Sequence, residues 1–308
     1  MTNKIQEANL AMVVSKTFSG LNVNALRYLL PLWIAPLTGV TFRCVFAAVA
    51  FWIIGYWAKP ETASVKDKIY LFLLGAVGIY GYMFSYLMGL SKTTPVSAAI
   101  FTSMQPIWVF ILSVFNEKAT VMKIVGILVG LGGALLCIST QKSDDLASDA
   151  FSGNLFCLVS SVIYAVYLIL SNRFLKRTGP YTLMRYTFSG AAVSSLIVMA
   201  FVGYEASLTT PPLHFWPIAL LLFVLIFPTV ISYLLIPTGL KYLSTTVVAI
   251  YGYLILVVAS IVSFLVGQDR FSWEQLGAML LICVGVYWVE IAENNGHERK
   301  RPHSPSIT

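Results

Sequence analysis

A lysine lies inside the first apolar stretch of the chain. Lys16 is followed at helical spacing by Ser19, Gly20, Val23 and Arg27, so one face of a helix here is polar or small. A cation inside a membrane span costs about 2.5 to 3.5 kcal/mol unless it faces a wet cavity or a partner. We expect this face to line a cavity, where Lys16 would attract a carboxylate or another anion. The alternative is that Lys16, about 10 Å into the helix, reaches the cytoplasmic surface with its long side chain.

Two further helical stripes combine aromatic and hydrogen-bonding side chains. They are Ser97, Phe101, Gln105 and Trp108, beside Pro106, and Ser160, Tyr164, Tyr167 and Ser171. Because a hydroxyl in hydrocarbon needs a hydrogen-bond partner, such faces normally turn inward. The competing interpretation, an aromatic belt at the membrane surface, suits Trp33, Trp57, Trp216 and Trp273 better, since these lie at the ends of apolar runs. The predicted substrate cavity is lined by Lys16, Ser19, Asn22, Tyr82, Tyr86, Phe101, Gln105, Trp108, Tyr164, Tyr167 and Tyr251.

Other residues are predicted to shape the fold or its movements. Arg43 and Arg185 occupy similar places in the two halves of the chain, which favours a scaffold role over direct contact with a substrate. Pro106, Pro228 and Pro237 would break or kink helices where a gate could move. The small-residue run Gly126, Gly130, Gly132 and Gly133 suits close helix contact or the face of a homodimer.

The chain offers little to enzymatic, metal or cofactor chemistry. The three histidines, His214, His297 and His303, lie near a span edge or in the tail, and no span pairs a histidine with a carboxylate. No GxxxxGK[ST] phosphate loop is present. The four cysteines fall in apolar stretches, where thiols behave as buried hydrophobes. We expect no catalytic residue, no metal site and no cofactor.

Composition assigns these residues to a membrane protein. Of 308 residues, 58% are hydrophobic and 11% are charged, against about 25% charged in a soluble domain. A crossing needs about 20 apolar residues, and charged residues, prolines and glycines divide the chain into ten such runs. Helices are therefore predicted at residues 9–30, 34–57, 69–90, 96–115, 121–140, 153–173, 181–203, 214–236, 245–267 and 274–292.

The basic residues predict an orientation and explain the net charge of +7 without nucleic acid. With the N-terminus inside, thirteen Lys and Arg residues fall in cytoplasmic segments and four, Arg27, Lys92, Lys142 and Arg270, in outer segments. This bias places both termini in the cytoplasm, across the inner (cytoplasmic) membrane. The bilayer and a small-molecule substrate are the expected partners.

The two halves of the sequence share an order of short matches. Gly89-Leu90 and Ala99-Ile100 recur 150 residues later as Gly239-Leu240 and Ala249-Ile250. Each half holds five predicted spans, an odd number, so the second half would enter the membrane inverted relative to the first. Such an inverted-topology repeat suits alternating access to a central site. Coincidence among apolar segments, which share letters easily, is the alternative.

With these features the chain resembles the drug/metabolite transporter superfamily, specifically bacterial transporters with two EamA-type domains. The resemblance is carried by Phe18 to Asn22, Pro36 with Arg43, Asn116-Glu117-Lys118, Gly126 with Gly130 to Gly133, and Gly267-Gln268. It implies a central cavity between two five-helix repeats, residues 1–142 and 153–292, joined by an outer linker at 143–152 and followed by a basic cytoplasmic tail at 293–308. The chain departs from the usual pattern at Gln268 and Lys16, so Glu117 is interpreted as a structural loop residue.

The sequence therefore predicts an all-α polytopic membrane protein that works as a secondary transporter. Export or exchange of a small metabolite, such as an amino acid or organic acid, is the leading hypothesis. Export of drugs or other amphipathic compounds is the alternative, and a channel or membrane-embedded enzyme is a more distant one. No carboxylate is visible at the middle of a span, so the coupling mode stays open.

Overall fold

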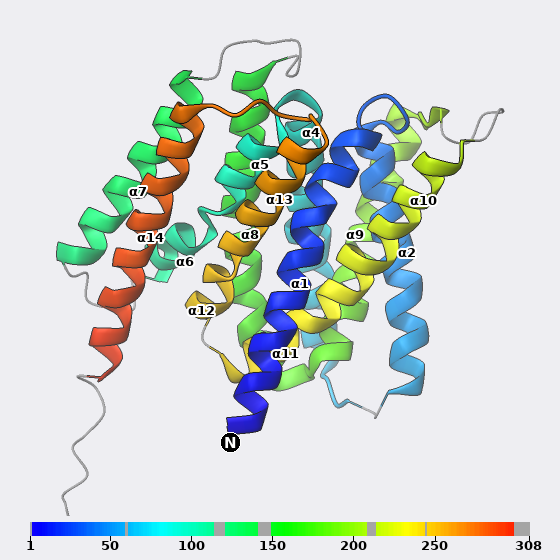
Figure 1. The fold of residues 1–308 in the computed structure, drawn as a ribbon. Coiled ribbons are helices and arrows are strands. Elements are labelled where there is room, and N and C mark those ends of the chain that lie inside the picture. The colour runs from blue at the N-terminus through cyan, green and yellow to red at the C-terminus, as the bar shows by residue number, and fades with distance from the viewer. Residues whose placement is uncertain are drawn as a thin grey trace, which may run out of the picture.

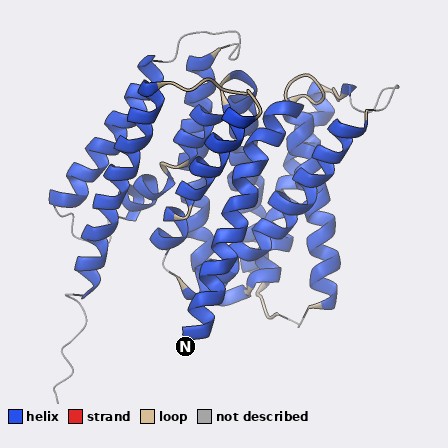
Figure 2. Cartoon of the chain, in the orientation of Figure 1, coloured by secondary structure: helices blue, strands red, loops and turns tan. Residues whose placement is uncertain are grey.

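The computed structural model describes residues 2–58, 61–113, 121–140, 149–207, 214–243 and 245–298. In these ranges the chain consists of helices and loops (Figure 2). The elements are α1 (Thr2–Leu29), α2 (Pro36–Trp57), α3 (Val65–Leu74), η1 (Gly75–Ile79), α4 (Tyr80–Lys92), α5 (Pro95–Thr102), α6 (Gln105–Ser113), α7 (Val121–Thr140), α8 (Ala150–Thr178), α9 (Pro180–Val202), α10 (Phe215–Val224), η4 (Leu225–Ile231), α11 (Ser232–Tyr242), α12 (Thr245–Ile250), α13 (Gly252–Leu265) and α14 (Trp273–Glu298).

Prolines and polar side chains determine where several helices begin. Pro36, Pro95 and Pro180 each occupy the first position of a helix, where the missing N–H would have no intrahelical partner. The Thr94 side chain caps α5 by accepting from the Ser97 N–H at 3.4 Å. Asp149 caps α8 in the same way, through the Ser152 N–H at 3.3 Å. Hydrogen bonding to Ser152 also lowers the pKa of Asp149.

Two of the predicted spans contain a break, and the first break lies beside Pro106, one of the prolines expected to break or kink a helix. Residues 96–115 fall on α5 and α6, with Ser103 and Met104 between them. Pro106 explains this break, because its ring would clash with the carbonyl of Thr102 in a continuous α-helix. Residues 245–267 fall on α12 and α13, which separate at Tyr251. Gly252, a poor helix former, begins the second piece.

Two longer helices stay continuous but contain a π-helical segment. The segment η1 joins α3 to α4, and η4 joins α10 to α11. Pro228 lies inside η4, where the wider turn accommodates a residue without an N–H. The composite helices span residues 65–92 and 215–242, an exact displacement of 150 residues. This is the displacement of the short sequence matches.

Among the described residues, seven helical stretches are long and apolar enough to cross a bilayer. They are Pro36–Trp57, Val65–Lys92, Pro95–Leu112, Ala150–Thr178, Pro180–Val202, Phe215–Tyr242 and Val247–Leu265. Two shorter apolar stretches, Ile124–Gly133 and Trp273–Gly285, belong to α7 and α14. The predicted class, a polytopic helical membrane protein, is confirmed. Ten crossings and an inverted repeat stay predictions.

Helices from the two halves of the sequence pack against one another in pairs. α2 packs on α9, α4 on α8 and α7 on α14, while α1 contacts both α11 and α13. Figure 1 shows α1 crossing the bundle between α11 and α13, with the α7 and α14 pair at one side. Glycines permit the closest approaches. A Cβ built at Gly285 of α14 would lie 2.5 Å from the carbonyl oxygen of Gly126 in α7, so these glycines serve contact between the two helices.

Several predicted boundaries shift at the helix ends. α1 begins seven residues before the predicted position 9, and α11 continues six residues beyond the predicted end at 236. α8 begins at Ala150, inside the predicted linker 143–152. α14 continues through Glu298, so the first part of the predicted tail 293–308 is helical. Polar ends of helices carry no hydrophobic signal, which explains why the sequence placed these boundaries too early or too late.

Candidate functional site

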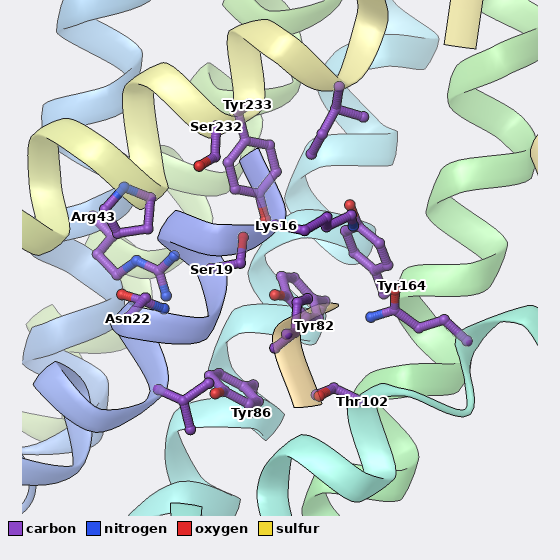
Figure 3. Close-up of a pocket in the computed structure, with 15 residues that line it drawn as sticks. Lys16, Ser19, Asn22, Arg43, Tyr82, Tyr86, Thr102, Tyr164, Ser232 and Tyr233 are labelled. Carbon is purple, nitrogen blue, oxygen red and sulfur yellow. The ribbon is translucent and has the colours of Figure 1, made fainter. Parts of the chain in front are cut away.

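A small cavity lies at the centre of the bundle, where helices from both halves meet (Figure 3). Its free volume is about 40 Å³, enough for a few water molecules. The lining residues are Lys16, Ser19, Asn22 and Val23 of α1, Arg43 of α2, Tyr82 and Tyr86 of α4, Thr102 and Gln105 around the α5 to α6 break, Tyr164 of α8, Pro228 of η4, Ser232, Tyr233 and Ile236 of α11, and Ile255 of α13.

The polar face of α1 lies along this cavity. Lys16, Ser19, Asn22 and Val23 follow one another at helical spacing, so the cavity receives a single side of the helix. Lys16 is only 3% exposed, and its ammonium nitrogen lies 5.8 Å from the centroid of the Tyr164 ring. The alternative, in which the Lys16 side chain reaches the cytoplasmic surface, does not fit this burial. A cation at this distance over an aromatic face is attracted by the ring quadrupole.

Arg43 enters the cavity from α2 and is held by the π-helical segment. The side chain is 2% exposed, and its Nε–H donates to the Thr229 hydroxyl at 3.0 Å. The Thr229 hydroxyl donates in turn to the carbonyl of Val224 at 2.7 Å, five residues earlier in the same helix. The second bond orients the hydroxyl oxygen toward Arg43. The Nη1 atom of Arg43 is buried and has no hydrogen-bond partner among the described residues.

Tyrosine rings form much of the remaining wall. The ring centroids of Tyr82 and Tyr164 lie 4.7 Å apart, and those of Tyr82 and Tyr86 lie 6.2 Å apart. Tyr233 contributes a further ring from α11 and makes an edge contact with Phe188 at 4.9 Å. Such surfaces give an apolar body a large contact area, and their hydroxyl groups remain available for hydrogen bonding.

Two amides on the cavity wall hold unused hydrogen-bond acceptors. The side-chain carbonyl oxygens of Asn22 and Gln105 are buried without a partner among the described residues. Buried polar atoms are usually satisfied, and each one left unpaired costs about 1 to 3 kcal/mol. Unsatisfied groups gathered at one cavity are typical of a site that completes its hydrogen bonds with a ligand or water.

The charges on the cavity wall are all of one sign. Lys16 and Arg43 are the ionisable side chains with a positive charge, and none of the fifteen lining residues is Asp or Glu. Burial of an uncompensated cation costs several kcal/mol, because the low-dielectric surroundings solvate it poorly. The site is therefore electrostatically prepared for negative charge.

The structure brings together seven of the eleven residues predicted to line a cavity. Lys16, Ser19, Asn22, Tyr82, Tyr86, Gln105 and Tyr164 all lie on its wall. The break before α6 interrupts the stripe that runs from Ser97 to Trp108, so its side chains do not share one face. Phe101 is fully buried in the core, and the indole N–H of Trp108 donates to the Ser161 hydroxyl at 2.9 Å. Neither belongs to the cavity wall.

Tyr167 and Tyr251 also lie away from the described cavity wall. Tyr167 is buried beside Tyr164, with ring centroids 5.9 Å apart, and its hydroxyl has no hydrogen-bond partner among the described residues. Tyr251 lies at the break between α12 and α13, where its hydroxyl donates to the side-chain oxygen of Asn9 at 3.0 Å. This bond joins the second half of the chain to the start of α1.

The residues predicted to shape the scaffold separate into different environments. Arg43 and Pro228 line the cavity, whereas the Arg185 guanidinium packs on α2, 5.3 Å from the Trp52 ring. Pro106 and Pro237 lie in α6 and α11 outside the cavity wall. Glu117 lies outside the described residues. Arg43 and Arg185, which the sequence treated as equivalent, therefore have different surroundings.

Sequence reasoning missed Thr102, Ser232 and Tyr233 as lining residues. The last two belong to an apolar run in which Thr229, Ser232 and Tyr233 occupy positions i, i+3 and i+4. That spacing marks one polar face of a helix and could have identified them. Thr102 gives no comparable signal, because its position depends on the break before α6.

Outside the membrane-spanning part, Asp269 connects the loop after α13 to the start of α5. Its carboxylate accepts from the Val96 N–H at 3.3 Å and from the Arg270 N–H at 2.9 Å. Burial of this carboxylate raises the pKa of Asp269. As for metals, no group of three or more His, Cys, Asp or Glu side chains in the described part of the chain is arranged to hold an ion.

A multi-pass helical bundle with a polar cavity at its centre is an arrangement typical of membrane transporters. The chain belongs to the EamA-like transporter family, whose sequence model matches residues 6–139 and again residues 151–291. The resemblance to this superfamily is confirmed. A solved crystal structure shares the fold with a TM-score of 0.62 at 20% identity, over 93% of this chain and 98% of that one.

Several relatives carry transporter names. The uncharacterized transporter YyaM of Bacillus subtilis is 27% identical over 270 residues, which are 86% of this chain and 88% of that protein. An uncharacterized transporter of Archaeoglobus fulgidus is 24% identical over 78% of this chain and 81% of its own length. The aromatic amino acid exporter YddG of Ancylobacter novellus is 26% identical over 130 residues, or 41% of this chain and 45% of that protein. These names point to transport rather than enzymatic catalysis.

Proposed function

We propose that this protein is a secondary transporter that exports or exchanges a small metabolite, such as an amino acid or organic acid, through the central cavity. The observation that carries the proposal is the concentration of buried polar and charged side chains at one cavity in a membrane bundle. Polar groups at membrane depth are costly and usually mark a substrate pathway. The name of the relative YddG, an aromatic amino acid exporter, supports this class of substrate.

The proposed mechanism is alternating access. The cavity has room for a few water molecules only, so a metabolite enters when the surrounding helices move apart. The composite helices 65–92 and 215–242 carry the π-helical segments η1 and η4 at the same relative position. Each composite helix also contributes residues to the cavity wall, Tyr82 and Tyr86 from the first and Pro228 and Ser232 among those from the second. Interrupted or widened helices at corresponding positions of two halves suit the movement of one half against the other.

Flux measurements in proteoliposomes test this function. Purified protein is reconstituted and offered a mixed panel of amino acids, organic acids and amines, with empty vesicles as the reference. A carrier gives saturable flux that accelerates when substrate is present on the opposite side. A flux that rises linearly with concentration and shows no such acceleration would indicate a channel and contradict the proposal.

We further propose that the protein lies in the inner membrane with both termini in the cytoplasm, as the distribution of Lys and Arg predicts. Reporter fusions after residues 145 and 300 test the orientation. The first fusion should report an external position and the second a cytoplasmic one. Two fusions on the same side would exclude the arrangement with ten crossings.

A further inference from the structure

The charge of the central cavity narrows the substrate class, on condition that the proposed transport function holds. We infer that the preferred substrate is an organic anion: a carboxylate without an ammonium group, attached to an apolar or aromatic body and anchored by Arg43. The inference concerns the same cavity and uses three properties of its wall, namely its charge, the geometry of Arg43 and the tyrosine rings.

The charge argument separates anions from zwitterions. Lys16 and Arg43 are both at least 97% buried, and no carboxylate lies among the lining residues. A bound anion offsets the cost of burying these cations. A zwitterionic amino acid would bring its own ammonium into the same cavity and meet no Asp or Glu side chain there. The cavity therefore favours net negative charge over a zwitterion, and disfavours an amine most strongly.

The geometry of Arg43 favours it as the anchor. Its Nε–H is committed to Thr229 at 3.0 Å, which fixes the plane of the guanidinium, while Nη1 has no partner in the described part of the chain. In Figure 3 this guanidinium extends from α2 into the cavity near Asn22. A guanidinium fixed in this way directs the free N–H donors of Nη1 at a carboxylate oxygen in a defined geometry, which a flexible ammonium does not.

The tyrosines determine what the rest of the substrate should be. Tyr82, Tyr86 and Tyr164 place their rings around the cavity away from Arg43 (Figure 3). The ring centroids of Tyr82 and Tyr164 are 4.7 Å apart. Aromatic walls bind an apolar or aromatic group through area and ring packing. A carboxylate at Arg43 with a ring among these tyrosines uses both parts of the wall.

Three matched compounds test the inference directly: 3-phenyllactate, phenylalanine and phenethylamine. They share one phenyl group and differ in charge, because phenyllactate is an anion, phenylalanine a zwitterion and phenethylamine a cation. In proteoliposomes containing the full chain, we expect saturable flux of phenyllactate at least tenfold faster than that of phenylalanine at equal concentration, and no saturable flux of phenethylamine. This comparison uses the unaltered protein and does not depend on how a variant folds.

A pair of conservative variants then tests the anchor. Arg43→Lys keeps the charge but removes the planar guanidinium, so the apparent KM for phenyllactate should rise at least tenfold. The matched control is Arg185→Lys, because Arg185 is half-buried and packs on Trp52 outside the cavity. Its KM should stay within twofold of the unaltered protein. A KM that changes equally in both variants would contradict an anchoring role for Arg43.

The outcomes distinguish the inference from the proposed function. Saturable flux of phenylalanine or phenethylamine above that of phenyllactate would overturn the inference and leave the transporter assignment intact. Saturable flux of smaller organic anions alone would support the charge argument and refute the aromatic body. No saturable flux for any compound in the mixed panel would overturn the proposed function, and the inference with it.

Discussion

Substitution of Gly89 by alanine should separate two helices that carry the tyrosine wall. Gly89 lies on α4, one turn after Tyr86, where α4 packs on α8. A Cβ atom at this position would lie 2.7 Å from the carbonyl oxygen of Gly153 and 2.9 Å from the backbone nitrogen of Cys157. The Cys157 sulfur would lie 2.6 Å away. Real Cβ atoms essentially never approach non-bonded heavy atoms within 3.0 Å, and two of these three obstacles belong to the backbone.

The cost follows from the required movement. To restore a contact of 3.4 Å, α4 must move about 0.7 Å away from α8. A gap of roughly 0.5 to 1 Å loses about a quarter to a half of the dispersion energy of the atoms that face it. Overpacking of this kind costs about 1 to 3 kcal/mol. Alanine gains about 1 kcal/mol over glycine in helix propensity, which offsets part of this cost.

The matched control is Gly132→Ala on α7, because a Cβ there meets no atom within 4 Å. Both variants gain the same helix propensity, so their difference isolates the packing cost. For a cost of about 2 kcal/mol, the thermal midpoint of Gly89→Ala in detergent should be roughly 4 to 8 °C below that of Gly132→Ala. We also expect slower transport by Gly89→Ala, since Tyr86 moves with α4. If Gly89→Ala is as stable as Gly132→Ala, the backbone of α4 does not approach α8 as closely as described.

Three other substitutions test individual contacts. Thr229→Val removes the acceptor for the Arg43 Nε–H, a bond to a charged group worth about 1.5 to 3 kcal/mol, so the apparent KM of transport should rise about 10- to 100-fold. Trp108→Phe removes the bond to the Ser161 hydroxyl and should lower the free energy of unfolding by about 1 kcal/mol, measured by denaturant titration. Burial raises the pKa of Asp269, so the native state binds more protons than the unfolded chain between the two pKa values. The stabilising contribution of protonated Asp269 is therefore complete below the unfolded pKa and is lost as the pH rises through the higher native pKa. Asp269→Asn should remove this dependence, as thermal midpoints measured across the acidic range would show.

Each of these expectations has a clear contrary result. An unchanged KM in Thr229→Val would mean that the hydroxyl does not position Arg43. If Trp108→Phe and Ser161→Ala add without coupling in a double-mutant cycle, the two side chains do not interact. Equal pH profiles for the Asp269→Asn variant and the unaltered protein would show that Asp269 titrates alike in the folded and unfolded chains.

The sequence predicted those features that depend on local hydrophobicity and spacing. Apolar runs bounded by Pro, Gly and charges predicted the helices, and a face with Lys16 at helical spacing was expected to line a cavity. The structure places Lys16, Ser19 and Val23 of that face on the central cavity wall, whereas Gly20 packs against Val258 and Arg27 bonds to the Ser91 carbonyl. Such features depend on residues a few positions apart, so a single helix already contains the information.

The surroundings of individual side chains could not be predicted, because they depend on contacts between segments that are distant in the sequence. The environment of Arg43 requires Thr229, which is 186 residues away, and nothing near Arg43 in the sequence indicates this partner. Arg185 occupies a similar local context but packs on Trp52. The stripe through Phe101 and Trp108 failed for a related reason, because the break before α6 changed the direction of side chains that a continuous helix would have aligned.

The polar character of α1 has a consequence for how the protein is made. Asn9, Lys16, Asn22 and Asn24 lower its hydropathy so far that α1 is absent from the apolar stretches described above. Polar atoms of α1 form hydrogen bonds with residues of the second half of the chain. The Ser15 hydroxyl donates to the carbonyl oxygen of Ser232, 217 residues away, and the Ser232 hydroxyl donates to the carbonyl oxygen of Ser15. During synthesis the ribosome completes α1 long before α11. We expect α1 to remain loosely inserted at the translocon until the second half of the chain arrives to cover its polar face.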